Sequence, residues 1–359
     1  MSQPAVAILY QATPPPVIDG LRKDAKPGGY SDGGADIAVA LRARGVRIVT
    51  PVAAPDPARA LDWVFPDTPE GIAAALAAGA DTLWANTVLF TGHPIEAVPP
   101  GTAIVGQDAA AMQRFDDKFA TNAMLAAAGL PVARSFLLGG TARDGVHALT
   151  EVAGVLEAHA LPFPLIVKPV RGRGSQGVTL VADLPALLAA AEALIAGARF
   201  GDVLMVEQFL DGEEMTVTIL PAACPRPDGT HGARPFALRP VRRFDQRDGV
   251  APYNGDVPVT ANSAAIDAGR MGDPAVAAML DACIAAAERV DARTAIRIDC
   301  RAGADGRLLL FDLNMKPNMT GPGRPGRDDQ DCLSAIAARA DGWDYGDLLL
   351  AMLAGRWVV

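Results

Sequence analysis

Three oxygen-bearing side chains near residue 300 have the types and spacing of a magnesium site. Asp299 lies within residues 297–301, and Asp312 and Asn314 lie within residues 310–317, each in an apolar stretch with the composition of a strand. A carboxylate is costly to bury in such a stretch unless a cation or a donor meets it, and hard oxygens are the ligands that magnesium prefers. The alternative, which these residues alone leave equally open, is an ordinary hairpin with solvent-facing acids.

The segment between the two apolar stretches predicts how these side chains come together. Residues 302–307 contain two glycines and an aspartate, a composition typical of a tight turn, so we expect an antiparallel hairpin. Alternate residues of a strand point to the same side. We therefore expect Asp299, Asp312 and Asn314 to lie on one face of that hairpin.

A second motif has the residue types of a polyphosphate-binding site. Lys168 ends the apolar stretch 163–168, a glycine-rich turn follows at 172–177, and another apolar stretch begins at Val178. An ammonium group beside exposed backbone N–H groups binds phosphate oxygens. The strand after the turn distinguishes this motif from the Walker loop and from GxGxxG, both of which open a helix. The alternative is a glycine hairpin with incidental cations.

Two weaker motifs could also contribute to nucleotide binding. The linker 207–210 follows an apolar strand, and its backbone could hydrogen-bond an adenine edge, while Glu214 could accept from ribose hydroxyls. Lys118 lies on a helix predicted at 108–128, from which it could reach a phosphate. Taken singly, acids in a turn and a lysine on a helix are usually solvated.

The elements that must position these residues fall into three regions, with boundaries predicted at 107/108 and 208/209. Residues 1–107 alternate strand and helix patterns, which favours a doubly wound parallel sheet. A long loop at 11–32 follows its first strand and is well placed for substrate, the alternative being a plain surface connection. Strands are predicted at 5–10, 46–52, 82–85 and 103–105, and helices at 33–45 and 71–78.

The regions 108–208 and 209–359 have a different pattern. The short turn after residue 169 favours an antiparallel sheet backed by helices. Strands are predicted at 132–138, 163–169, 178–181, 203–207, 215–220 and 235–241, and helices at 108–128, 149–160, 184–196, 274–290, 329–341 and 345–353.

Composition excludes several classes of protein. A chain of 359 residues is too long for one compact core, so we expect two or three domains. A formal net charge of -9 argues against a nucleic-acid partner. The four cysteines and four histidines lack zinc-site spacing, and the sequence shows neither a signal core nor an apolar run of membrane-spanning length. We expect a cytoplasmic protein without a membrane partner.

Taken in order, the motifs resemble the ATP-grasp superfamily, and among its members D-alanine:D-alanine ligases. The order is a lysine helix, a Lys-Pro strand with a glycine loop, a Glu-x-Phe-Leu linker, and Arg-x-Asp and Asp-x-Asn on a hairpin, spanning roughly Val105 to Thr320. The resemblance implies an α/β protein in which an N-terminal doubly wound parallel domain precedes a two-subdomain α+β ATP-grasp fold.

The resemblance also implies ATP and two Mg²⁺ ions as cofactors, with a role for each motif. Arg297 would stabilise an oxyanion, and Lys168 would be catalytic as well as phosphate-binding. The metal ligands would be Asp299, Asp312 and Asn314. The nucleotide-binding residues would be Lys118, Lys168, Arg173, Gly174, Ser175, Gln176, Gly177, Glu207, Gln208, Phe209, Leu210 and Glu214.

Departures from the family lie where substrates would bind. The family's Gly-Gly-x-Ser segment is present, but its glutamate position is Gly33, and only the neighbouring Asp32 could substitute. After the hairpin, Asn318 stands where the family has glycine. The substrate residues we expect are Gly28, Gly29, Tyr30, Ser31, Asn318, Arg324 and Arg327, the two arginines binding a carboxylate.

The implied function is an ATP-dependent carboxylate–amine ligase that forms an amide or peptide bond through an acyl phosphate and releases ADP and phosphate. Its partners would be small carboxylate and amine substrates that resemble amino acids, and similar ligases are commonly homodimers. The alternatives are a thiol or hydroxyl acceptor, a true D-alanine:D-alanine ligase, and a non-catalytic nucleotide-binding protein.

Overall fold

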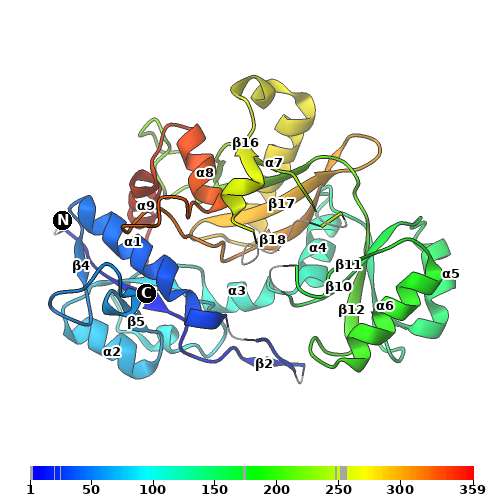
Figure 1. The fold of residues 1–359 in the computed structure, drawn as a ribbon, viewed down its shortest axis with the longest axis horizontal. Coiled ribbons are helices and arrows are strands. Elements are labelled where there is room, and N and C mark those ends of the chain that lie inside the picture. Colours follow the sequence, from blue (N-terminus) through cyan, green and yellow to red (C-terminus); the bar gives the residue numbers. More distant parts are fainter. Residues whose placement is uncertain (1–2, 20, 25, 173–174, 247–248, 251–256) are drawn as a thin grey trace.

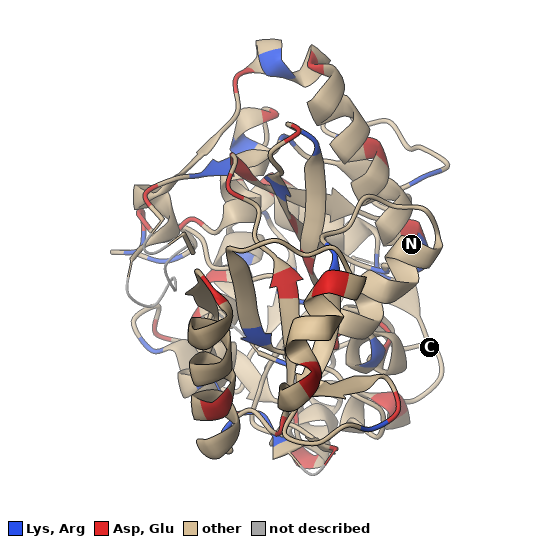
Figure 2. Ribbon diagram, turned by 90° about the vertical axis from the view of Figure 1, so that its right-hand side faces the viewer, with Lys and Arg blue, Asp and Glu red and all other residues tan. Residues whose placement is uncertain are grey.

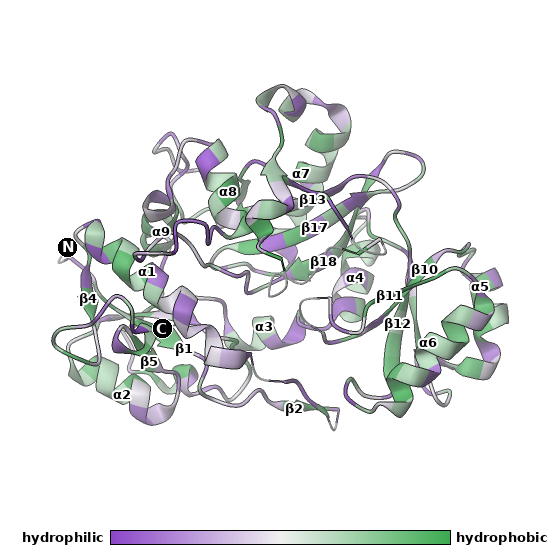
Figure 3. Ribbon diagram, in the orientation of Figure 1, coloured by the Kyte–Doolittle hydropathy of each residue, from purple (hydrophilic) through white to green (hydrophobic). Residues whose placement is uncertain are grey.

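The protein is described here from a computed structural model, which covers residues 3–359 apart from 20, 25, 173–174, 247–248 and 251–256. Three large sheets are flanked by helices (Figure 1). Charged residues of both signs are interspersed along the ribbon (Figure 2), and apolar residues concentrate on the strands and the inner sides of the helices (Figure 3). Within the described residues no helix has both the length and the apolar character needed to span a membrane.

The first sheet is parallel, as predicted, except for one antiparallel edge strand. Its central strand β1 (Ala5–Tyr10) is buried, because apolar residues occupy both of its faces. Strand order reverses on either side of β1, which makes the crevice between β1 and β6 a topological switch point. The parallel order is β7 (Ala103–Val105), β6 (Thr82–Asn86), β1 and β4 (Arg47–Val49), with β5 (Val64–Pro66) also pairing with β1; α1 (Ser31–Ala43) and α2 (Pro69–Ala77) flank it.

Residues 345–358 also pack on this first sheet. Strand β19 (Trp357–Val358) pairs antiparallel with β7, and α9 (Tyr345–Ala354) lies beside α1. Arg44 at the end of α1 places Nη1 2.8 Å from Oδ1 of Asp347 on α9. The apolar residues of α9 and α1 share one core cluster. Residues 345–358, which we assigned to the third region, are therefore neighbours of the first sheet in space.

The second sheet is antiparallel except for one pair, and α5 (Val152–Ala158) and α6 (Leu184–Ala196) form its core with it. The short glycine turn does join two antiparallel strands, as predicted. The strand order is β11 (Thr179–Val181), β10 (Leu165–Pro169), β12 (Val203–Gln208), β8 (Ser135–Gly139) and β9 (Val146–Ala148), the last pair being parallel.

The single helix predicted at 108–128 is wrong, because the structure has two helices there. They are α3 (Ala109–Arg114) and α4 (Lys118–Ala127). The Asp117 side chain accepts a hydrogen bond from the backbone N–H of Ala120 and thereby caps a new helix. The break places Lys118 at the first turn of α4 rather than in the middle of a longer helix.

The third sheet contains the predicted hairpin, formed by β17 (Ile296–Ala302) and β18 (Leu308–Asn314). Helix α7 (Pro274–Arg289) shares a core with the apolar residues of β17, so the alternate residues of that strand face away from α7. The order is β16 (Ser263–Ala265), β15 (Val241–Arg243), β13 (Glu214–Leu220), β17 and β18, with β14 (Phe236–Ala237) on β13; α8 (Leu333–Ala340) packs on β13.

The predicted substrate loop is an ordered strap that runs from the first sheet to the second. We call its described residues within 11–30 the strap. It contains the small hairpin β2 (Val17–Ile18) and β3 (Leu21–Arg22) and the 3-10 turn η1 (Pro27–Tyr30). Lys23 Nζ lies 2.7 Å from Oδ1 of Asp116, next to α4. The strap is thus attached at both ends.

We predict that Gly29→Ala destabilises the protein more than Gly28→Ala. Both glycines have positive φ values, 55° and 69°, which cost an alanine about 1 kcal/mol. At Gly29 a Cβ would also lie 2.0 Å from the carbonyl oxygen of Gln11, whereas the first contact at Gly28 is at 3.6 Å. G29A should therefore lose roughly 1–3 kcal/mol more unfolding free energy than G28A, measured by denaturant unfolding. Equal losses in the two variants would contradict this account of the strap.

Candidate active site

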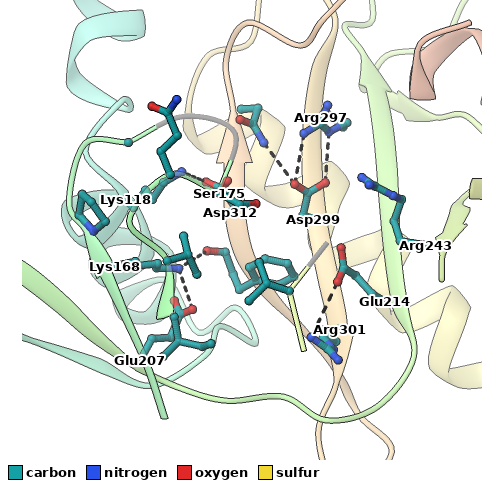
Figure 4. A pocket seen from close by; sticks show the side chains of 18 of the residues that line it. Lys118, Lys168, Ser175, Glu207, Glu214, Arg243, Arg297, Asp299, Arg301 and Asp312 are labelled. Atoms are coloured by element: carbon teal, nitrogen blue, oxygen red, sulfur yellow. Dashed lines mark hydrogen bonds and ion pairs between the residues drawn. The ribbon is translucent and has the colours of Figure 1, made fainter. Parts of the chain in front are cut away.

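A cavity of about 270 Å³ lies between the second and third sheets, and the strap reaches its edge. Lys118, Lys168 and Glu207 approach from one side of it, and Asp299, Arg297 and Arg243 from the other (Figure 4). Cations from the second subdomain thus face the carboxylates of the third sheet across one space.

The hairpin places four polar side chains on the cavity side. Asp299 pairs directly with Asp312 across the two strands, and Arg297 pairs with Asn314. The register then shifts, because Cys300 pairs with Leu310 and leaves Phe311 as an extra residue. Such a bulge re-aims neighbouring side chains, so Phe311 and Asp312 both line the cavity although they are adjacent in sequence.

Each carboxylate of the hairpin already has a cationic partner. Arg297 Nε lies 3.2 Å from Oδ1 of Asp299, and Asn314 Nδ2 lies 3.5 Å from its Oδ2. Lys118 donates to Asp312 in an ion pair. Burial opposes ionisation of Asp312, but Lys118, Lys168 and Arg297 outweigh burial and lower the pKa of its carboxyl. The carboxylate of Asp312 is therefore a ready ligand for a cation.

The donor set fits magnesium better than a transition metal. It consists of two carboxylates and one amide, all oxygen donors, and the described residues contain no group of three or more His, Cys, Asp or Glu that could hold a metal ion. Magnesium is typically held by one or two carboxylates, with phosphate oxygens and water completing its shell. Asp299, Asp312 and Asn314 match that requirement. In this structure the two carboxylates form ion pairs with Arg297 and Lys118.

Lys168 is held by a buried ion pair. Its Nζ lies 2.7 Å from Oε2 of Glu207, and both side chains are at most 5% exposed. Burial raises the pKa of Glu207, against the opposing effect of Lys168. Asn122 on α4 donates to the other carboxylate oxygen at 3.4 Å. The side chain of Glu207 thus positions Lys168 at the wall of the cavity.

The linker and the glycine loop contribute most of the nucleotide-binding residues that we predicted. Strand β12 ends at Gln208, and Phe209 and Leu210 continue along the cavity wall. Glu214 lines it too, with Arg301 Nη1 3.8 Å from its Oε2. From the loop, Ser175 and Gln176 line the cavity, whereas Gly177 packs against Pro169 outside the lining. Arg173 and Gly174 lie outside the described residues.

The predicted substrate residues divide into two groups. Tyr30 and Asn318 line the cavity, whereas Gly28, Gly29 and Ser31 are in the strap and the start of α1 without lining it.

Arg324 and Arg327 are not part of the cavity lining. Arg324 is buried, and its Nε lies 2.8 Å from Oδ1 of the buried Asp36 on α1. Arg327 Nε is 2.8 Å from the same oxygen, and Arg324 also reaches Asp32 at 3.0 Å. Burying Asp36 requires cationic partners. The assignment of these arginines to a substrate carboxylate is therefore corrected: they fasten the segment after β18 to α1.

Four cationic residues of the described lining were not predicted from the sequence: Lys26, Arg243, Arg301 and Lys316. Lys316 lies between Asn314 and Asn318, both of which were predicted site residues, and this closeness was the available signal. Lys26 and Arg243 stood in loops or strand ends, where basic residues are usually solvated, and no spacing distinguished them.

Solved structures with the same fold are ATP-grasp ligases. A D-alanine–D-alanine ligase from Bacillus anthracis matches with a TM-score of 0.65 and 16% identity, covering 98% of this chain and 96% of that one. D-alanyl-alanine synthetase A from Vibrio cholerae matches with a TM-score of 0.66 and 12% identity, at 98% coverage of both chains. The chain therefore has the fold of these ligases, an α+β ATP-grasp fold.

Sequence comparison narrows this class. The model of the family described as D-ala D-ala ligase C-terminus matches residues 124–354, and the chain belongs to that family. D-alanine–D-alanine ligases from Bifidobacterium animalis subsp. lactis and Stutzerimonas stutzeri are 29% and 30% identical to it over 231 and 239 residues, or 61% and 66% of this chain. These matches span 59% and 64% of the relatives' own length.

We predict that Lys168→Met destabilises the protein by about 3–5 kcal/mol, because it leaves Glu207 buried without its cation. The double variant Lys168→Met/Glu207→Gln should recover most of the loss. Burial raises the pKa of Glu207, so acidification protonates this side chain and removes the buried charge. The loss of unfolding free energy caused by K168M should therefore become smaller as the pH falls from about 8 to about 5. Denaturant unfolding at both pH values measures this, and a loss that grows on acidification would contradict it.

Proposed function

We propose that the protein is an ATP-dependent ligase that joins a carboxylate to an amine through an acyl phosphate, releasing ADP and phosphate. One observation carries the proposal: Lys118 and Lys168 face Arg297, Asp299 and Asp312 across a single cavity. This arrangement has cations for a polyphosphate, oxygen ligands for magnesium and a donor for an oxyanion. The names of the relatives, D-alanine–D-alanine ligases, support the reaction class.

ATP is the nucleotide that we propose for the cavity. Phe209, Leu210 and Phe311 offer an apolar wall for a base, and Glu214 lies near enough in the lining to accept from a ribose. Lys118, Lys168 and the glycine loop would hold the phosphates. One of the solved relatives is a D-alanine–D-alanine ligase from Bacillus anthracis complexed with ATP, which supports this choice.

Two magnesium ions would be held by Asp299, Asp312 and Asn314 together with phosphate oxygens. When bound, magnesium neutralises the charge of the phosphates and polarises the phosphoryl group that is transferred. Lys118 and Arg297 now neutralise these carboxylates, so they are placed to turn toward the phosphates and the reacting acid when the ions are present.

The reaction would proceed in two displacements. A carboxylate oxygen of the acid attacks the terminal phosphorus of ATP, the bond to ADP breaks, and an acyl phosphate forms. The amine then attacks the acyl carbon, phosphate leaves with the bonding electrons, and the amine proton passes to solvent or a base. The tetrahedral intermediate carries a negative oxygen, which the half-buried guanidinium of Arg297, next to the proposed metal ligand Asp299, would stabilise.

The location and substrates follow from this proposal. All four cysteines are buried free thiols, which suits the reducing cytoplasm where ATP is available. The substrates would be a small acid and a small amine, and a homodimer is the assembly that we propose from the resemblance. The relatives' names favour D-alanine as the substrate of a second candidate function, a true D-alanine–D-alanine ligase.

We predict that Asp312→Asn lowers ADP release at least about 100-fold and raises the magnesium concentration required for half-maximal rate, because one of two carboxylate ligands is lost. Asp305→Asn, in the exposed turn of the same hairpin, is the matched control and should retain the wild-type rate. If D312N kept the wild-type rate and magnesium requirement, Asp312 would not be a magnesium ligand.

The decisive experiment measures ADP release with Mg-ATP and pools of small carboxylic acids, using hydroxylamine as a general amine. Hydroxylamine converts any acyl phosphate into a hydroxamate, which identifies the intermediate without knowledge of the natural amine. The ligase proposal expects hydroxamate in proportion to ADP. A protein that does not bind Mg-ATP would defeat the proposal at its first step.

A further inference from the structure

Arg243 is a cationic residue of the cavity lining whose Nε is buried and has no hydrogen-bond acceptor among the described residues. It belongs to β15, and its side chain extends toward Asp299 beside Glu214 (Figure 4). Burial lowers the pKa of its guanidinium, and the charges of those two carboxylates oppose this effect. A buried N–H without an acceptor is costly, so the position favours a ligand that accepts from it.

The two carboxylates next to Arg243 accept hydrogen bonds from other residues. Arg297 Nε donates to Oδ1 of Asp299 at 3.2 Å. Gln246 Nε2 donates to Oε2 of Glu214 at 3.1 Å. Arg243 thus faces two anions whose oxygens are engaged elsewhere, which leaves its planar set of N–H groups directed into the cavity.

The register of the third sheet places Arg243 in the half of the cavity that we propose for the nucleotide. Arg243 pairs with Glu214 on β13, and Glu214 pairs with Arg301 on β17. The guanidinium of Arg301 lies over the ring of Phe209 in the linker, 4.9 Å from its centre. Arg297 is four residues before Arg301 on β17, about 13 Å along the strand. Arg243 therefore lies level with the proposed base and ribose positions rather than with the residue proposed for the oxyanion.

The direction of the side chain selects the part of the nucleotide that it would meet. From the level of Glu214, the proposed ribose acceptor, Arg243 extends toward Asp299, a proposed magnesium ligand (Figure 4). The phosphates of a nucleotide lie between its ribose and its metal ions. A guanidinium presents its N–H groups in a planar fork that binds two phosphate oxygens at once. Lys118 and Lys168 approach the same space from the opposite side (Figure 4).

We infer that Arg243 binds the polyphosphate of ATP from the side opposite Lys118 and Lys168, and is a further nucleotide-binding residue of this enzyme. The inference rests on the proposed ligase function, because it assigns a residue to the same site. A phosphate oxygen accepts from the Nε that has no acceptor among the described residues. Removal of the guanidinium should therefore change the binding of phosphate groups and leave the binding of the base and of the acid unchanged.

Arg242 provides a matched control for Arg243. The two residues are adjacent on β15, so their side chains point to opposite faces of the sheet. The Arg242 side chain is 51% exposed, its Nε lies 4.0 Å from Oε1 of Glu213, and it is outside the cavity lining. Arg242→Met removes the same charge from the same strand without changing the cavity.

The test is calorimetric binding to the full chain in the presence of magnesium. The probes are a non-hydrolysable ATP analogue, inorganic tripolyphosphate and adenosine. Arg243→Met should weaken the binding of the analogue and of tripolyphosphate at least about tenfold, because a charge-assisted contact is lost, and should leave adenosine binding unchanged. Arg243→Lys should retain part of the affinity for both phosphate probes. R242M should bind all three probes like the wild type.

Steady-state kinetics give a second readout. In the hydroxamate assay, R243M should raise the KM for ATP at least about tenfold and leave the KM for the acid unchanged. Unchanged tripolyphosphate binding in R243M, an equal loss of adenosine binding, or a rise confined to the KM for the acid would overturn the assignment. An equal loss in R242M would also overturn it, since the effect would then come from net charge. Unfolding midpoints verify that the variants are folded.

The outcome for the ligase function is separate. If the wild-type protein binds the ATP analogue and forms hydroxamate while R243M does both equally well, the ligase function stands and the assignment of Arg243 is wrong. If the wild-type protein does not bind the analogue with magnesium, the ligase function itself fails. Hydroxamate formation by the wild type, together with a selective loss of phosphate binding in R243M, supports both.

Discussion

The active site depends on the need to neutralise charges that are removed from water. Asp312 and Glu207 are carried by different sheets, and each is neutralised by a lysine from across the cavity or from a neighbouring strand. A buried carboxylate without its cation costs several kcal/mol. Lys118 on α4 thus joins the second subdomain to the hairpin of the third sheet, whereas Lys168 and Glu207 pair within the second sheet. A nucleotide with its metal would replace these protein partners with phosphate and metal.

Two local irregularities make this arrangement possible. The bulge at Phe311 lets one strand present an apolar ring and the carboxylate of Asp312 to the same cavity. The break between α3 and α4 places Lys118 at a helix start, from which it reaches the hairpin. Both features interrupt regular hydrogen bonding, and both lie at the site where the chemistry would occur.

Local patterns sufficed to predict the hairpin and the glycine turn, because each is determined by residues close in sequence. The parallel sheet was predicted from the alternation of strands and helices along the chain. The break at Asp117 was missed, since the apolar pattern continues through it and only the cap distinguishes two helices from one. The pairing of Arg324 with Asp36 and the meeting of Lys26 with Lys316 depend on segments almost 300 residues apart. No spacing in the sequence encodes such contacts.

The pairing of β19 with β7 has a consequence for biosynthesis. A ribosome adds about 5–20 residues per second, so α9 and β19 emerge roughly 10–50 s after β7. During that interval the edge of β7 has no β19 to pair with, and the apolar residues of α1 that α9 later covers stay exposed. A nascent chain in this state offers an open strand edge to other chains. The strand order thus leaves this edge of the first sheet to be covered last.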